Sequence, residues 1–187
     1  MPTRIMIPVV LLLFLTGSAG WAQQKLSDQP GYVSVEQLDL FPKEDLSVEI
    51  NLEGALLRMV AAATRGEDPA FAQMISNLKG IQVQVFPLAG VEEKTVRTKI
   101  GRAVRLLEDR GWKATVRVRE KDEESYIYLK ESGDQILGLT VLAFTAGQEA
   151  ALINIVGKLD PAQLERLGRN LDIPQLQKVP TGGKKPE

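Results

Sequence analysis

The stretch that decides the fold is residues 112–156, which read WKATVRVREKDEESYIYLKESGDQILGLTVLAFTAGQEAALINIV. Apolar and polar residues alternate from Trp112 to Arg119, and this period of two predicts a β-strand with one covered face. Turn signals at residues 122–124, at Gly133 and at Gly147 separate three further strand segments, which are 126–129, 136–144 and 150–156. The last two segments are nearly continuous apolar runs, which predicts central strands of the sheet. Four consecutive strands indicate an antiparallel meander.

The residues before this stretch add helices and two more strands. Alternation predicts strands over 46–52, with Leu46, Val48, Ile50 and Leu52 on one face, and over 81–85. The Ala/Leu-rich run 53–65 predicts a helix. Gly66 marks its end, because glycine is favoured just after the last residue of a helix. Asp68 and Pro69 supply a cap and a first helical residue, so we expect a short helix from there to Gly80.

Two more helices are expected later in the chain. Apolar residues at helical spacing predict a helix over 91–110, closed by Gly111. Asp160 and Pro161 repeat the capping pattern and predict a last helix, whose apolar stripe is Leu164, Leu167 and Leu171. The sequence therefore predicts an α+β fold: a largely antiparallel sheet of about six strands with helices packed mainly on one face, a two-layer sandwich. We expect one such domain over residues 31–177, since no linker-like change in composition interrupts it.

The N-terminal residues have the pattern of an export signal. Arg4 precedes an 11-residue apolar run from Ile5 to Leu15, and Gly20-Trp21-Ala22 forms a small-x-small cleavage pattern. We expect a signal peptide over 1–22 and a periplasmic or secreted protein; an uncleaved N-terminal anchor is the alternative. After cleavage we expect no integral membrane span, a flexible lead-in over 23–30, and a disordered tail over 178–187, where apolar residues are scarce.

The composition argues against many chemistries. The 187 residues include no cysteine and no histidine, which excludes disulfides, a lipidated cysteine, Cys nucleophiles and Ser-His catalysis. Glycine-rich phosphate loops and HExxH or GxSxG motifs are also absent. We therefore expect no cofactor and no metal, and assign no catalytic residue. A His-independent hydrolase using carboxylates stays open as an alternative.

The charge is uneven along the chain. The net charge is −1, yet nine basic and two acidic residues lie between Lys94 and Arg119. Six of them form a candidate basic patch for an acidic envelope protein or anionic headgroups: Lys94, Arg97, Arg102, Arg105, Arg117 and Arg119. The alternative is a solvated surface neutralised by nearby glutamates, such as Glu93 four residues before Arg97. We expect no nucleic-acid partner, because the protein is acidic overall and poor in aromatic residues.

The sequence leaves open the roles of three polar residues in the predicted strands. Asn154 interrupts the most apolar strand; if it faces inward it must be hydrogen-bonded, as a structural lock or as a polar group in a pocket. Tyr126 and Tyr128 share a strand face with Lys130. They are either a solvent-facing contact surface or ordinary cross-strand packing.

Several short segments of the sequence resemble those of an exported bacterial family catalogued as domain of unknown function 4252. They include Gly31-Tyr32-Val33, Val48-Glu49-Ile50-Asn51-Leu52, Leu78-Lys79-Gly80-Ile81, Gly111-Trp112, Val116-Arg117-Val118-Arg119-Glu120 and Ile153-Asn154-Ile155-Val156-Gly157. The resemblance spans roughly residues 31–174. It implies an envelope protein but no reaction, cofactor or catalytic residue, and the lack of an anchoring cysteine favours a soluble form.

We therefore expect an exported, non-enzymatic envelope protein that binds a protein or an anion through its sheet face or its basic helix. Two alternatives remain open. A small-ligand or lipid carrier requires an apolar cavity between helices and sheet, and the hydrolase requires a concave site lined by carboxylates.

Overall fold

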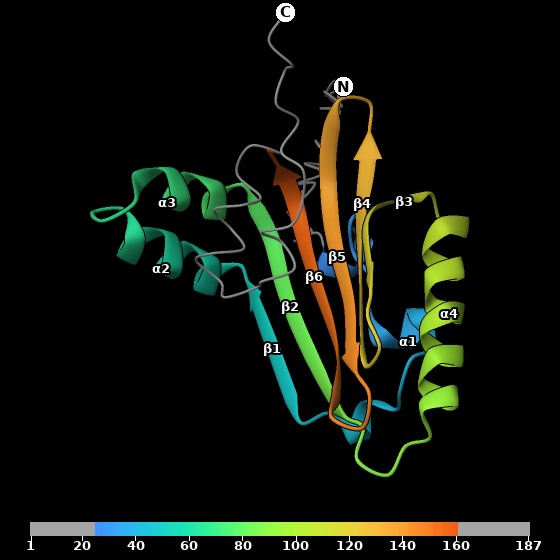
Figure 1. The fold of residues 1–187 in the computed structure, drawn as a ribbon. Helices are drawn as coiled ribbons and strands as arrows, with labels where there is room; N and C mark the ends of the chain where they lie inside the picture. The colour runs from blue at the N-terminus through green and yellow to red at the C-terminus, as the bar shows by residue number, and fades with distance from the viewer. Residues whose placement is uncertain (1–24, 161–187) are drawn as a thin grey trace, which may run out of the picture.

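Six antiparallel strands form one sheet in the computed structural model, which describes residues 25–160 (Figure 1). The strand order is β1-β2-β6-β5-β4-β3, so the last four strands are neighbours in chain order. Their bounds are β1 (Val48–Glu53), β2 (Leu78–Pro87), β3 (Trp112–Arg119), β4 (Glu123–Ser132), β5 (Gln135–Thr145) and β6 (Glu149–Leu159). The predicted α+β fold with a six-stranded antiparallel sheet is confirmed.

In the part of the chain that the structure describes, four α-helices and two short 3-10 helices accompany the sheet. They are η1 (Leu26–Asp28), α1 (Val35–Leu38), η2 (Lys43–Asp45), α2 (Ala55–Thr64), α3 (Pro69–Ser76) and α4 (Glu93–Asp109). The predicted cap of α3 is present, because the Asp68 side chain accepts a hydrogen bond of 3.0 Å from the Phe71 N–H. The expected continuation of this helix to Gly80 is wrong: α3 ends at Ser76, and Leu78 already pairs with Gly157 of β6.

The helices divide between the two faces of the sheet (Figure 1). α1 and α4 pack on one face, hereafter the α4 face, where Ile100 and Leu107 of α4 join a core with Leu142 and Phe144 of β5. α2 and α3 form a smaller helical layer at one end of the opposite face. There the buried cluster includes Leu57, Phe71, Met74, Ile81, Ile127, Leu139 and Ile155.

β1 lies at the edge of the sheet and is less buried than its alternating pattern predicts. Val48 and Ile50 point away from the α4 face, yet their relative solvent exposure is 41% and 42%. Their strand has a neighbour on one side only, within the described residues. As an edge strand, β1 also has exposed side chains on the α4 face. The candidate site lies beside them.

Residues 25–40, hereafter the N-terminal segment, run across the α4 face. Gly31 lies directly against Gly138 of β5: a Cβ added to Gly138 would be 2.5 Å from the Gly31 Cα. Leu26 of η1 packs over Gly80 of β2, where a side chain would occupy the same space. Thus the described part of the expected lead-in, residues 25–30, includes a turn that packs on the sheet.

Asn154 fixes the N-terminal segment to the middle of the sheet. Its Oδ1 accepts from the Val33 N–H at 3.0 Å, and its Nδ2 donates to the Gly31 carbonyl at 3.0 Å. The same Nδ2 group lies 3.0 Å from the Thr140 Oγ1 and 3.2 Å from the Leu139 carbonyl oxygen. Because Asn154 is fully buried and all its polar atoms are bonded, it acts as the structural lock, the first of the two explanations.

Several predictions concern residues outside the described part. These are the signal peptide over 1–22, the last helix with Leu164, Leu167 and Leu171, and the tail over 178–187. Over residues 25–160, no helix combines the length and apolar character required to cross a membrane.

Candidate functional site

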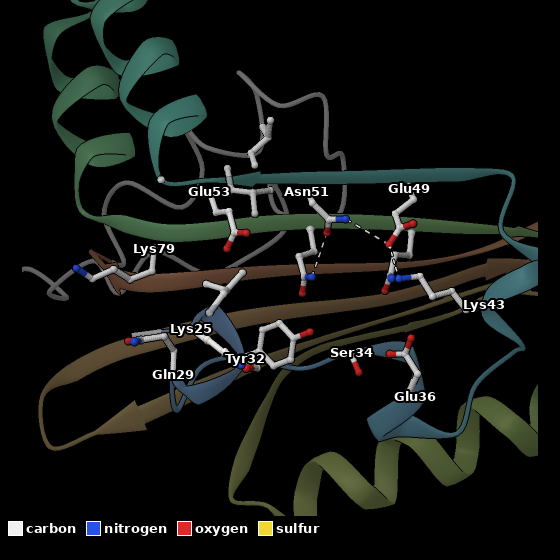
Figure 2. A pocket seen from close by; sticks show the side chains of 17 residues that line it. Lys25, Gln29, Tyr32, Ser34, Glu36, Lys43, Glu49, Asn51, Glu53 and Lys79 are labelled. Atoms are coloured by element: carbon white, nitrogen blue, oxygen red, sulfur yellow. Dashed lines mark hydrogen bonds and ion pairs between the residues drawn. The ribbon is translucent and has the colours of Figure 1, made fainter. Parts of the chain in front are cut away.

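A polar groove of about 860 Å³ lies on the α4 face beside the sheet edge (Figure 2). Its floor is formed by side chains of β1 and β2, and the N-terminal segment forms the facing wall. The groove exists because β1 is an edge strand while the N-terminal segment is fixed to β5 and β6, so the space between them is not filled by a helix.

Four polar side chains from two strands share the floor. Glu49 and Asn51 of β1 lie opposite Gln84 and Gln82 of β2 in the antiparallel register, so all four point to the α4 face. The Gln82 Nε2 donates to the Asn51 Oδ1 at 3.1 Å, and the Asn51 Nδ2 donates to the Glu49 Oε1 at 3.2 Å. The Lys43 ammonium lies 3.0 Å from the same carboxylate oxygen. This chain of contacts joins Gln82, Asn51, Glu49 and Lys43 across the floor.

Two acceptors on this floor have no donor. The side-chain carbonyl oxygens of Gln82 and Gln84 are buried and lack a hydrogen-bond partner among the described residues. Gln84 is only 3% exposed. A buried polar atom without a partner costs about 1–3 kcal/mol, and folded proteins rarely leave such groups unpaired. These two oxygens lie beneath the surface of the groove floor, so a ligand would reach them only if the side chains around them moved.

Among residues 25–160, charged side chains of both signs line the groove in equal number. Three lysines and three glutamates line it, namely Lys25, Lys43, Lys79, Glu36, Glu49 and Glu53. Hydrogen bonding from Lys43 is the largest cause that lowers the pKa of Glu49, and the same hydrogen bond raises the pKa of Lys43. Both groups are therefore ionised at neutral pH. Tyr32 is the one aromatic side chain that the described residues contribute to the lining, and its ring projects from the N-terminal segment toward the strands (Figure 2).

The basic patch proves to be largely paired within the protein. Arg97 forms ion pairs with Glu93 at 2.7 Å and with the buried Glu124. Arg119 lies 3.3 Å from Glu124 and donates to the Tyr126 hydroxyl at 3.1 Å. The Tyr126 hydroxyl in turn donates to Glu124. These contacts connect α4 with the β3–β4 hairpin.

Arg117 belongs to a second group of the same kind. Its guanidinium pairs with Glu108 of α4 and lies 3.2 Å from the Tyr128 hydroxyl, which itself donates to Glu108 at 2.9 Å. Burial raises the pKa of Tyr128 to about 12, with a further contribution from the Glu108 carboxylate. The hydrogen bond with Tyr128 raises the pKa of Arg117. Tyr126 and Tyr128 are 7% and 0% exposed, so they are packed side chains and form no solvent-facing contact surface.

The remaining three residues of the patch lie on the outer surface of α4. Arg102 pairs with Asp39 of the N-terminal segment. Lys94 and Arg105 are exposed, and neither has an acidic partner among residues 25–160. Lys94 and Arg102 border a shallow hollow of about 420 Å³, together with Lys99. The structure thus brings the six predicted residues together only in part and leaves two cations available to an external anion.

Sequence reasoning missed the groove. Its signal was the pair Gln82 and Gln84, which alternate with Ile81, Val83 and Val85. Polar residues at every second position are typical of a solvated strand face. Only the tertiary structure places the N-terminal segment over them and makes that face a concave site.

A family model for a domain of unknown function, DUF4252, matches residues 41–167. The chain belongs to the DUF4252 family. The match covers every strand of the sheet and α2, α3 and α4, and it includes both β1 and β2 of the groove floor. The facing wall of the groove, residues 25–36, precedes the matched region. No curated protein matches the chain, and no solved structure matches it.

Proposed function

We propose that this DUF4252 protein is an exported, non-enzymatic binding module of the bacterial envelope, periplasmic or secreted, whose ligand site is the polar groove. One observation carries the proposal: a groove of about 860 Å³ lies beside the sheet edge, and hydrogen bonds and an ion pair hold the polar side chains of its floor in place. Small-ligand sites are concave and use a few fixed polar groups to orient the ligand; this groove is concave and has such groups, but its lining is more polar than usual. The pattern of residues 1–22 supports export.

Binding suits this groove better than hydrolysis does. A carboxylate pair of the glycosidase type needs one member that carries a proton near neutral pH. Glu49 does not fit this role, because the Lys43 ammonium lies 3.0 Å away and lowers its pKa, and Asn51 donates to the same carboxylate oxygen. A lipid carrier is a weaker alternative, since lysines, glutamates and amides line the groove and would be desolvated by an acyl chain.

A second candidate site rests on the exposed cations of α4. Lys94 and Arg105, without acidic partners in the described residues, suit an acidic envelope protein or anionic headgroups. This is the part of the expected basic patch that internal ion pairs leave available. Its matched test is the double charge reversal of Lys94→Glu and Arg105→Glu, which leaves Glu93, Glu108 and Glu124 with their arginines.

The experiment that tests the proposed function compares three purified proteins. The wild type, Gln84→Leu and the Lys94→Glu/Arg105→Glu variant are incubated with the low-molecular-weight fraction of a bacterial envelope extract and analysed by native mass spectrometry. We expect a bound mass on the wild type and on the α4 variant, and at least tenfold less on Gln84→Leu. Loss on the α4 variant alone would assign binding to the basic surface. No bound mass on any protein would overturn the proposal.

Export has its own test. The full chain is expressed in a bacterium, cells are fractionated, and the N-terminus of the recovered protein is sequenced. We expect a periplasmic or secreted protein that begins at Gln23, because the small-x-small pattern ends at Ala22. A cytoplasmic protein that begins at residue 1 or 2 would contradict export.

A further inference from the structure

The two edge strands of the sheet, β3 and β1, are protected to different degrees. β3 includes one lysine and two arginines, shows a register shift against β4, and has α4 packed beside it. Charged side chains, bulges and covering helices keep an edge strand from pairing with another chain. β1 pairs with β2 in unbroken register and includes no basic residue and no proline. Of the two, β1 is therefore the edge that can accept a further strand.

The outer side of β1 is open. Apart from the ladder with β2, residues 48–53 make no backbone hydrogen bond to any of residues 25–160. In an antiparallel ladder the N–H and C=O groups of alternate residues point to opposite sides of the strand. About half of these groups in β1 therefore face away from β2, and a strand laid along β1 would satisfy them.

Apolar side chains gather at the same edge. Four large apolar side chains of residues 25–160 remain exposed, and all belong to β1 or to α2: Val48, Ile50, Leu56 and Met59. α2 follows β1 after Gly54 and, in the view of Figure 1, lies on the side of β1 away from β2. An exposed apolar patch beside an unpaired strand edge is typical of a surface that binds another chain.

The sequence of β1 suits pairing with a second copy of itself. In an antiparallel pair related by a two-fold axis, residues at equal distances on either side of the axis lie opposite each other. With the axis at Ile50, this residue faces its own copy, and Val48 faces Leu52 of the second copy. These apolar side chains then form one row on the face of the sheet that carries α2. On the other face, Glu49 lies opposite Asn51 of the second copy, a carboxylate opposite an amide donor.

The other register that keeps most of β1 paired has its axis at Asn51. It places Glu49 opposite Glu53 of the second copy, and like charges directly opposite each other destabilise a strand pair. In the register centred on Ile50, Glu53 lies opposite the neutral Ser47 instead. The distribution of charge along β1 therefore selects the axis at Ile50.

We propose that the protein forms a two-fold symmetric dimer, in which β1 pairs antiparallel with β1 of a second copy in the register centred on Ile50. The two six-stranded sheets then join into one. Glu49 and Asn51 also belong to the groove floor, so the pairing places the two grooves side by side and brings Asn51 of the second copy next to each floor. The dimer does not depend on what the groove binds.

Disulfide trapping tests the register, because the chain contains no cysteine of its own. Opposite residues of an antiparallel pair have Cα atoms about 4.5–5.5 Å apart, a separation that a disulfide spans. Ile50→Cys should therefore give a disulfide-linked dimer under mild oxidation. Val48→Cys is the matched control, since Val48 lies on the same face of β1 and is 41% exposed against 42% for Ile50. Its Cα would lie about 14 Å from that of the second copy, so we expect about tenfold less linked dimer.

Sedimentation velocity at a series of protein concentrations tests the assembly in solution. The full chain is expressed in a bacterium, and the protein is used as recovered. We expect the wild type to dimerise and Ile50→Lys to be monomeric, because this change places two ammonium groups opposite each other. Thr98→Lys adds the same charge on the exposed surface of α4 and should dimerise like the wild type. Circular dichroism melting shows whether each variant is folded.

Three outcomes would overturn the dimer. Equal linkage of Ile50→Cys and Val48→Cys would contradict the register. A dimer that persists in folded Ile50→Lys would place the contact on another surface. A wild type that stays monomeric at every concentration would leave the edge of β1 to a different chain. The ligand mass in the envelope extract is measured separately, so the dimer and the proposed function can each fail alone.

Discussion

Asn154 shows how one polar side chain can organise two parts of a fold. It lies fully buried in β6, yet it bonds to backbone atoms at Gly31 and Val33, more than 120 positions earlier in the chain. An apolar side chain of similar size could fill the same space. The amide of Asn154, however, has its donor and its acceptor on separate atoms and so reaches both backbone groups at once.

Replacing Asn154 should destabilise the protein strongly. Asn154→Ala leaves the Val33 N–H and the Gly31 carbonyl buried without partners, so we expect a loss of about 2–4 kcal/mol in the free energy of unfolding. Urea denaturation followed by circular dichroism measures it. Asn51→Ala, an exposed asparagine of β1, is the control and should change stability by less than about 0.5 kcal/mol. Equal effects of the two changes would refute the lock.

Tyr128 should titrate at a more alkaline pH than an ordinary phenol. Its pKa rises from 10.0 to about 12, chiefly because burial disfavours the phenolate. The folded state therefore favours the neutral form. This contribution to stability is complete below pH 10 and is lost as the pH rises from 10 to 12. Ultraviolet titration near 295 nm should show one late phenol in the wild type that is missing from Tyr128→Phe. A late phenol that persists in the variant would belong to another residue.

Ion pairs explain why four residues of the basic patch lie where they do. α4 is amphipathic, and its buried stripe of Val96, Ile100, Ala103 and Leu107 is continuous. Its flank carries Arg97 and Glu108, which pair with residues of the β3–β4 hairpin. These ion pairs therefore hold the helix beside β3, which is an edge strand. Of the six patch residues, only Lys94 and Arg105 have no acidic partner among residues 25–160.

Two basic residues of α4 should respond differently to truncation. Arg97→Ala removes one of the two arginines that pair with the buried Glu124, so we expect a loss of about 1–3 kcal/mol. Lys94→Ala should cost less than about 0.5 kcal/mol, because this side chain is exposed. Chemical denaturation of the two single variants gives the comparison. Similar losses for both would contradict the division of the patch.

At the scale of the whole molecule, the groove depends on contacts far from its floor. The N-terminal segment is held where Gly31 meets Gly138, and neither glycine belongs to the groove lining. The two backbones approach so closely that a side chain has no room. Displacing the segment there should move the groove wall, including Tyr32.

Gly138→Ala should therefore weaken ligand binding from a distance. Its new methyl group would lie 2.7 Å from the Gly31 carbonyl oxygen, so the segment must shift. We expect faster hydrogen exchange at residues 26–36 and at least tenfold weaker binding of whichever ligand the groove takes. Gly101→Ala in α4 is the control, since its nearest contact is 3.7 Å away, and it should stabilise the helix by up to about 1 kcal/mol. Unchanged exchange in folded Gly138→Ala would refute the coupling.

The sequence predicts the helices and strands better than it predicts how they pack together. Alternation from Trp112 to Arg119 and the Asp68-Pro69 cap depend on near neighbours, so both could be read in advance. The end of α3 could not, because β2 begins at Leu78 through pairing with a strand about 80 residues later. The groove could not be predicted for the same reason. Gln82 and Gln84 look like solvated strand residues until the N-terminal segment, held by Asn154, covers them.

The hydrogen bonds of Asn154 also impose an order on folding. Their separation of 121 to 123 positions makes them among the least local contacts of the domain, and contacts of this kind form late and slow the folding of a chain. The N-terminal segment is synthesised first, but it has nothing to attach to until β6 is made and paired. We therefore expect the groove to be completed late in folding, and a chain that stops before residue 154 to lack the contacts that fix the groove wall.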